Sequence, residues 1–128
     1  MREYKFRGRD EHGVWHYGDL LSWPIIRSFN GWNYEYQEVE EDTVGQYTGL
    51  KDADGREIYE GDIVKATLKD KSFVKRFHMD GTVTGKISFD GAWWLGEWDA
   101  LWRLPRYYDL TVIGNIYDNP ELLKLTKK

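Results

Sequence analysis

The chain has 128 residues and a mass of 15.2 kDa, the length of one domain or two very small subdomains, which excludes a large multidomain enzyme. Its 22 acidic and 18 basic side chains give a formal net charge of −4, so the molecule as a whole repels a polyanion unless a local basic patch reverses the field. The absence of cysteine excludes disulfides, thiolate catalysis and thiolate metal ligands. Because the sequence contains no long apolar run, we expect a cytoplasmic protein that does not enter a membrane.

Aromatic residues and glycines dominate the composition, with seven Trp, nine Tyr, five Phe and 13 Gly. Aromatic side chains favour the half-buried surface of a pleated sheet, and Asp-Gly or Asn-Gly supplies the positive φ angles of tight hairpins. The turn signals fall at Asn30-Gly31, Asp54-Gly55, Asp80-Gly81 and Asp90-Gly91, with a longer relative at 10–13. The sequence therefore predicts a mainly β, antiparallel and meandering fold.

The strand-like runs between these turns form three expected pairs. They are Tyr4 to Arg9 with Val14 to Leu21, Ile25 to Phe29 with Trp32 to Val39, and Gly81 to Phe89 with Ala92 to Leu95. Thr111 to Tyr117 is expected to be the last strand. The glycine within it, Gly114, indicates a bulge or a close backbone approach.

Two short helices are expected. Trp94, Trp98, Leu101 and Trp102 follow a helical spacing that predicts two turns, ended by Pro105. Asn119-Pro120-Glu121 provides a capping residue, a proline at the first helical position and an acid in the first turn, which predicts a helix through Leu125.

An internal repeat connects the two halves of the chain. Phe6-x-Gly8-x-Asp10-x-x-Gly13, followed by Tyr17-Gly18-Asp19, aligns with Tyr47-x-Gly49, Asp52-x-x-Gly55 and Tyr59-x-Gly61-Asp62 once single insertions are allowed. Ancient duplication and convergence on one solution both explain the match. In either case an aromatic strand enters a tight Asp-x-x-Gly turn, and a Gly-Asp bend then begins a new strand.

Three stretches carry a resemblance that spans nearly the whole chain. They are Thr43 to Asp52, Gly55 to Val64 and Val112 to Leu123, supported by Phe6 to Asp10 at the start. With these motifs the chain resembles the YopX family of phage and prophage proteins. The stretches Trp23 to Tyr36 and Trp93 to Tyr108 depart from that pattern by their tryptophan content.

The resemblance implies an all-β homo-oligomer encoded by a mobile element, with an SH3-like small barrel in its second half, and it implies no particular activity. The short strands that follow Gly61-Asp62 independently favour such a barrel. We expect an N-terminal hairpin and oligomerisation subdomain over 1–58 and a barrel with a short C-terminal helix over 59–128. The boundary is then a direct strand-to-strand connection near Tyr59 to Asp62.

Motifs for chemistry are weak throughout. His12 and His16 flank a turn, Asp52-x-Asp54-Gly55 lacks the closing glutamate of a calcium loop, and Gly81 to Lys86 is one residue short of a phosphate loop. A solvated rim around the Gly-Asp bend is the favoured interpretation of Glu57, Glu60 and Asp62, rather than an acid–base pair. We therefore predict no catalytic residue, no metal, no cofactor and no enzyme activity.

Two features indicate binding. Residues 64–86 are locally basic and include Phe73, Phe77 and His78, which suits single-stranded nucleic acid bound by Lys69, Lys71, Lys75 and Arg76. A solvated hairpin that protects a sheet edge is the favoured alternative. The tryptophans Trp93, Trp94, Trp98 and Trp102 line either a groove or, as we favour, a face packed on the barrel.

The favoured function is that of a non-catalytic accessory protein that acts through contacts with phage or host proteins and through self-association. The tyrosine- and tryptophan-rich edge from Trp32 to Tyr36 is a liability for a monomer, and a symmetry mate would cover it. Nucleic-acid binding through the basic hairpin is the alternative.

Overall fold

The computed structural model describes residues 5–70, 81–96, 99–101 and 104–124. The chain divides into two compact units between Gly49 and Leu50. This boundary lies upstream of the one between residues 58 and 59 that the sequence indicated. The first unit contains β1 (Phe6–Arg9), β2 (Trp15–Ser22), β3 (Ile25–Phe29), β4 (Tyr34–Glu38) and the 3₁₀ turn η1 (Glu41–Thr43). Strand β5 (Gly45–Lys51) crosses from the first unit into the second. The second unit continues with β6 (Glu57–Tyr59), β7 (Asp62–Leu68), β8 (Thr82–Phe89), β9 (Trp93–Leu95), β10 (Asp99–Ala100), α2 (Leu104–Tyr107), β11 (Tyr108–Asn115) and α3 (Glu121–Lys124).

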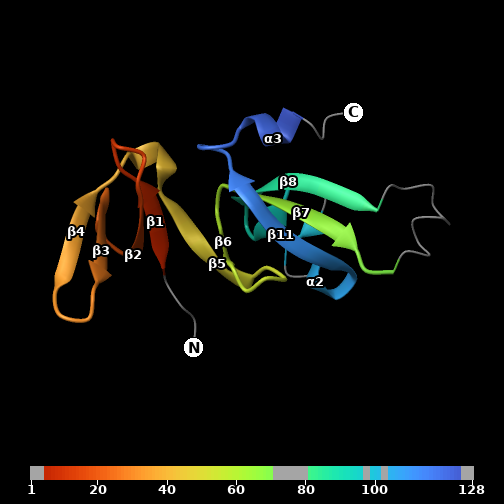
Figure 1. The fold of residues 1–128 in the computed structure, drawn as a ribbon, viewed down its shortest axis with the longest axis horizontal. Coiled ribbons are helices and arrows are strands. Elements are labelled where there is room, and N and C mark those ends of the chain that lie inside the picture. The colour runs from red at the N-terminus through yellow and green to blue at the C-terminus, as the bar shows by residue number, and fades with distance from the viewer. Residues whose placement is uncertain (1–4, 71–80, 97–98, 102–103, 125–128) are drawn as a thin grey trace. The chain divides into compact units, whose positions relative to one another are not determined.

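The fold is mainly β, as predicted, and its helices are very short. In the described part of the chain the strands form a sheet with the order β4-β3-β2-β1-β5-β6 and a second sheet with the order β10-β9-β8-β7-β11. The paired strands are antiparallel, and β1 to β4 form the predicted meander (Figure 1).

In the first unit, strand β1 packs closely against the segment that follows β4. Ile26 and Val39 are buried, and a Cβ placed on Gly8 would lie 2.4 Å from Val39 Cγ2. The side chain of Val39 therefore fills the space that any residue other than glycine would occupy in β1. Thr43 is also buried, where its Oγ1 accepts a hydrogen bond from the Arg9 N–H at 2.8 Å.

The second unit has its own apolar core, formed by residues of its strands, of the segment before α2 and of α2 itself. The buried members of this core are Ile58, Val64, Ala66, Ile87, Leu95, Leu101, Leu104 and Leu110. The predicted interruption of the last strand is confirmed: the register between β11 and β7 shifts between Val112 and Gly114. A Cβ on Gly114 would lie 2.5 Å from Asn119 Oδ1, so both explanations offered for this glycine apply.

The two Asp-x-x-Gly turns of the internal repeat have the same hydrogen bonds. Asp10 Oδ1 accepts the main-chain N–H groups of His12 and Val14 at 2.8 and 3.0 Å. Asp52 Oδ1 likewise accepts those of Asp54 and Arg56 at 2.9 and 2.8 Å. Gly13 and Gly55 close the turns with φ angles of 83° and 86°, in the left-handed region that favours glycine.

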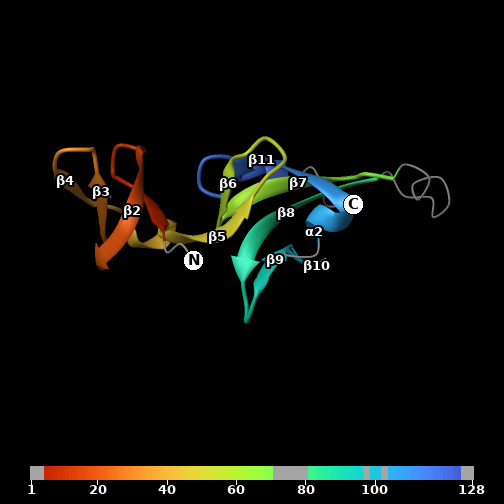
Figure 2. The same cartoon turned by 90° about the horizontal axis from the view of Figure 1, so that it is seen from below.

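The predicted helix over Trp94 to Trp102 is wrong. In the described part of this segment, Trp94 and Leu95 belong to β9, and Asp99 and Ala100 form β10; Leu95 pairs with Asp99 and Trp94 with Ala100. Strand β9 also pairs with β8, and the turn from β8 into β9 is visible in Figure 2. Pairing with the edge of β8 outweighs the local helical period, and Gly96 turns with a φ of 57°. Pro105 lies in the first turn of α2 rather than ending a helix, a position where its fixed φ and missing N–H are tolerated.

The C-terminal helix follows Asn119-Pro120, as predicted, and the structure describes it from Glu121 to Lys124. The Asn119 main-chain oxygen accepts the Leu122 N–H at 3.1 Å. Its side-chain Oδ1 accepts the Asn115 N–H at 3.2 Å and so ties the helix start to the end of β11. Leu125 lies outside the described residues.

Candidate interaction surface

One side of the β2–β3–β4 sheet exposes large aromatic rings. Directly opposed residues share a face, and the register pairs Phe29 with Tyr34 and Arg27 with Tyr36. Asp19 of β2 opposes Arg27, so alternation along β2 brings Tyr17 to the same face. We call this set the aromatic face: Tyr17, Phe29, Tyr34 and Tyr36, which are 46%, 60%, 52% and 57% exposed.

Arg27 lies among these rings. Its Nη2 donates to Asp19 Oδ2 at 2.9 Å, and its guanidinium carbon lies 4.7 Å from the centre of the Tyr34 ring. The hydrogen bond to Asp19 is the main reason that the pKa of Arg27 is raised above its ordinary value. Phe29 also packs against Tyr34, with 5.2 Å between the ring centres. The aromatic face therefore has a fixed cation and prearranged rings.

Trp32 occupies the tip of the β3–β4 hairpin and is 89% exposed. Asn30 builds this tip, because its Oδ1 accepts the N–H groups of Trp32 and Asn33, both at 2.9 Å. A turn stabilised by two hydrogen bonds thus holds the Trp32 indole ring in solvent, next to the aromatic face.

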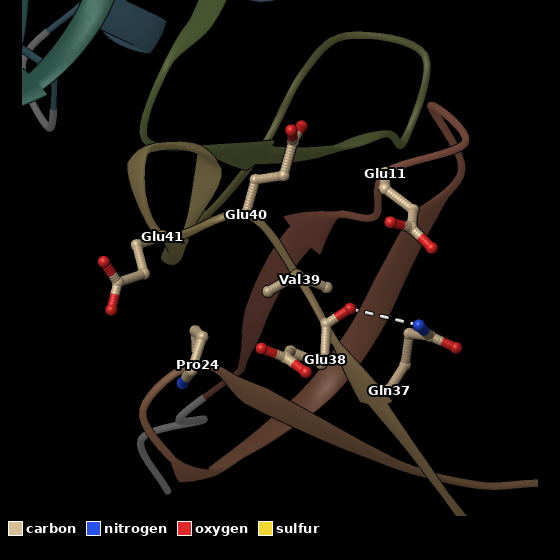
Figure 3. A pocket seen from close by; sticks show the side chains of 7 residues that line it. All are labelled: Glu11, Pro24, Gln37, Glu38, Val39, Glu40 and Glu41. Carbon is tan, nitrogen blue, oxygen red and sulfur yellow. Dashed lines mark hydrogen bonds between the residues drawn. The ribbon is translucent and has the colours of Figure 1, made fainter.

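An acidic pocket of about 510 Å³ lies elsewhere in the same unit (Figure 3). The four glutamates that line it are Glu11, Glu38, Glu40 and Glu41. Pro24, Gln37 and Val39 complete its lining. Glu41 accepts a hydrogen bond from the indole of Trp23 at 2.8 Å, and Glu40 lies 3.7 Å from Arg9 Nε. No group of three or more His, Cys, Asp or Glu side chains in the described residues has a geometry that could hold a metal ion.

Asp10 and His16 form a half-buried side-chain contact in this unit. His16 Nε2 lies 2.8 Å from Asp10 Oδ2, while the other carboxylate oxygen accepts two main-chain N–H groups. The contact with His16, and next the bond from the Val14 N–H, lower the pKa of Asp10 from 3.8 to about 2. The pair stabilises the first turn.

The basic residues predicted to bind nucleic acid are placed only in part. Lys69 is exposed directly after β7, whereas Lys71, Lys75 and Arg76 lie outside the described residues. Lys65 and Lys86 are exposed on neighbouring strands. The pairings of Lys65 with Thr84 and of Ile63 with Lys86 place both lysines on one face of the sheet.

The tryptophan cluster is also described only in part. Trp93 is half-buried and packs against the core of the second unit, and its ring meets Phe89 edge-on at 4.9 Å. Trp94 donates its indole N–H to Asp90 O at 3.1 Å. Trp98 and Trp102 lie outside the described residues.

Sequence reasoning identified Trp32 to Tyr36 as an exposed edge but missed Tyr17, Arg27 and Phe29. The alternation of Tyr17 with Asp19, and of Arg27 with Phe29, is present in the sequence. It becomes a shared face only when the strand registers are known. Within the described residues, no helix has the length and apolar character needed to span a bilayer.

Two small antiparallel units, one of which exposes an aromatic face, define a mainly β protein. The model of the family described as "YopX protein" matches residues 5–124, and the chain belongs to this family. The crystal structure of protein EF1440 from Enterococcus faecalis is similar, with 25% sequence identity and a TM-score of 0.56, covering 96% of this chain and 99% of that one. No curated protein matches the chain.

Proposed function

We propose that this YopX-family chain is a non-catalytic accessory protein of a phage or prophage, acting in the cytoplasm through protein contacts that include self-association. The aromatic face is the observation that carries the proposal. Tyrosine, tryptophan and arginine are the side chains enriched where proteins meet. Four exposed rings on adjacent strands around Arg27 form a cluster of apolar surface, which is more characteristic of an interface than the isolated apolar side chains found on most surfaces.

The rigidity of the aromatic face supports the same function. Each tyrosine has few rotatable bonds, and Arg27 is held between Asp19 and the Tyr34 ring. Association therefore orders few additional side chains, and less of the binding free energy is lost as entropy.

Self-association is tested by size-exclusion chromatography with light scattering at tens of micromolar protein. We expect a mass of at least twice the 15.2 kDa of one chain, and a shift toward the monomer in the double variant Tyr34→Ser, Tyr36→Ser. Tyr107→Ser is the matched control, because Tyr107 is similarly exposed but lies in the second unit. A wild-type protein that stays at 15.2 kDa over the whole concentration range contradicts the proposal.

Binding of single-stranded nucleic acid is the second candidate. Lys65, Lys69 and Lys86 favour it, because all three are exposed and two of them share a sheet face. Lysines on one face can follow a phosphate backbone. Asp109 weakens this candidate, since it is exposed on β11 and opposes Thr67, which shares the face of Lys65.

A further inference from the structure

Strand β4 is the terminal strand of its sheet in the described residues, and its backbone is arranged to accept another strand. Two hydrogen bonds fix which residues face outward: Asn30 N–H donates to Asn33 O at 3.1 Å, and Val39 N–H donates to Pro24 O at 3.0 Å. Between these bonds, antiparallel residues alternate between bonding to the neighbouring strand and facing away from it.

The alternation assigns the same residues of β4 to each side whether it is counted from the Asn30–Asn33 bond or from the Val39–Pro24 bond. Glu35 and Gln37 direct their backbone groups to β3. The residues whose N–H and C=O groups face away from β3 are Tyr34, Tyr36 and Glu38. The Gln37 side-chain amide donates to Glu38 O at 3.0 Å, so a side chain already occupies the direction from which a strand's N–H would bond (Figure 3).

We propose that β4 pairs with β4 of a second copy of this chain, antiparallel, about a twofold axis at Tyr36. This inference rests on the self-association proposed above and specifies its register. In this register Tyr36 opposes Tyr36 of the second copy, and Tyr34 opposes Glu38 at each side. All three outward-facing residues on each chain then exchange backbone bonds, about six bonds in total, with the partner strand's N–H replacing the Gln37 amide at Glu38 O.

Charge disfavours two alternative registers, and the number of backbone bonds disfavours an axis at Gln37, where within β4 only Tyr36 and Glu38 of each copy pair with outward-facing residues. A twofold axis at Glu35 brings two glutamates directly opposite each other and pairs fewer outward-facing residues, and an axis at Glu38 also opposes two glutamates. Like charges in direct opposition destabilise a strand pair. With the axis at Tyr36, Glu35 opposes Gln37 and Glu38 opposes Tyr34, so no two carboxylates are in direct opposition.

The same register joins the aromatic faces of the two copies. Tyr34, Tyr36 and Glu38 alternate onto one side of β4, and a twofold axis perpendicular to the sheet keeps that side common to both chains. The two Tyr36 rings meet at the centre, and Phe29 and Tyr34 of each copy flank them. A strand of a different protein could use the same edge, but it would not require this symmetry.

Cysteine cross-linking tests the register, because the natural chain contains no thiol. Tyr36→Cys places two thiols at a directly opposed pair with a Cα separation of about 5.5 Å, within the disulfide range of about 4.4–6.8 Å. Tyr34→Cys is the matched control on the same strand and face, with comparable exposure. Its two copies would lie four residues apart along the strands, about 14 Å, and could not form a bond within the dimer.

We expect Tyr36→Cys to form a disulfide-linked dimer under mild oxidation at least about tenfold faster than Tyr34→Cys. Circular dichroism checks that both variants keep the fold. If light scattering shows an oligomer but Tyr34→Cys cross-links as fast as Tyr36→Cys, the register is wrong while self-association stands. If the wild-type protein is a monomer at every concentration, the self-association itself fails, and with it the pairing of β4.

Discussion

Asp10 shows how one carboxylate can stabilise a turn and a neighbouring strand together. One oxygen satisfies two main-chain N–H groups, and the other meets His16 at the start of β2. The ionised form is favoured by all these partners, which lowers the pKa of Asp10 to about 2. The stabilisation therefore depends on the charge of this carboxylate.

The sign of the pH dependence follows from that lowered pKa. Because the folded value lies below the ordinary value of 3.8, the contribution of Asp10 is fully present above pH 3.8 and is lost as the pH falls through about 2. We predict that Asp10→Asn lowers the melting temperature at pH 7, and that the gap to wild type narrows on acidification across this window. Thermal unfolding from pH 7 to pH 2 measures it. Glu11→Gln, an exposed change in the same turn, is the control, and a constant gap at every pH would contradict the prediction.

At the scale of the elements, the second Asp-x-x-Gly turn makes hydrogen bonds to a distant strand that the first turn does not make. The second carboxylate oxygen of Asp52, Oδ2, accepts the Val112 N–H at 2.9 Å. This bond joins the turn to β11 across 60 residues of sequence. The Ala53 N–H adds a bond to Leu110 O at 2.8 Å. The same local turn thus supports a histidine contact in the first unit and a contact to the last strand in the second.

We predict that Asp52→Ala destabilises the protein by roughly 2–4 kcal/mol, because three main-chain N–H groups lose a charged acceptor at a buried position. Asp54→Ala in the same turn is the control and should change stability by less than about 0.5 kcal/mol, since Asp54 is exposed. Urea unfolding of the two variants measures the difference. Equal midpoints would show that the three bonds to Asp52 together contribute nothing to stability.

The sequence predicted the hairpins well and the segment after β9 poorly, for a physical reason. Hairpins β1–β2, β3–β4 and β8–β9 are encoded locally, by Asp or Asn and Gly at the turns and by aromatic residues in the strands. The helical spacing of Trp94 to Trp102 was equally local, but the edge of β8 that competes for this segment is not visible in a short window. The aromatic face was missed in part for the same reason, since it depends on the register of three strands.

At the scale of the whole molecule, charge is distributed unevenly between the surfaces that could bind a partner. Glutamates surround the pocket of the first unit, whereas exposed lysines lie on β7 and β8 of the second. The net charge of −4 opposes the approach of a polyanion to the molecule as a whole. A nucleic acid would therefore need the basic segment 64–86, while a protein partner could use the aromatic face without that electrostatic cost.

This asymmetry allows nucleic-acid binding to be tested separately from self-association. If Lys69, Lys71, Lys75 and Arg76 neutralise about four phosphates on a single strand, the logarithm of affinity should fall with the logarithm of salt concentration at a slope near −3, about 0.7 per contact. Fluorescence anisotropy with labelled single-stranded DNA measures the slope, and replacing all four residues by Glu should abolish binding. The double variant Tyr34→Ser, Tyr36→Ser is the control and should keep the slope, since its changes lie in the other unit. Absence of binding at about 50 mM salt, where phosphate contacts are strong, would eliminate nucleic acid as a partner. An affinity independent of salt would place the contact on aromatic rings instead, because stacking releases no counterions.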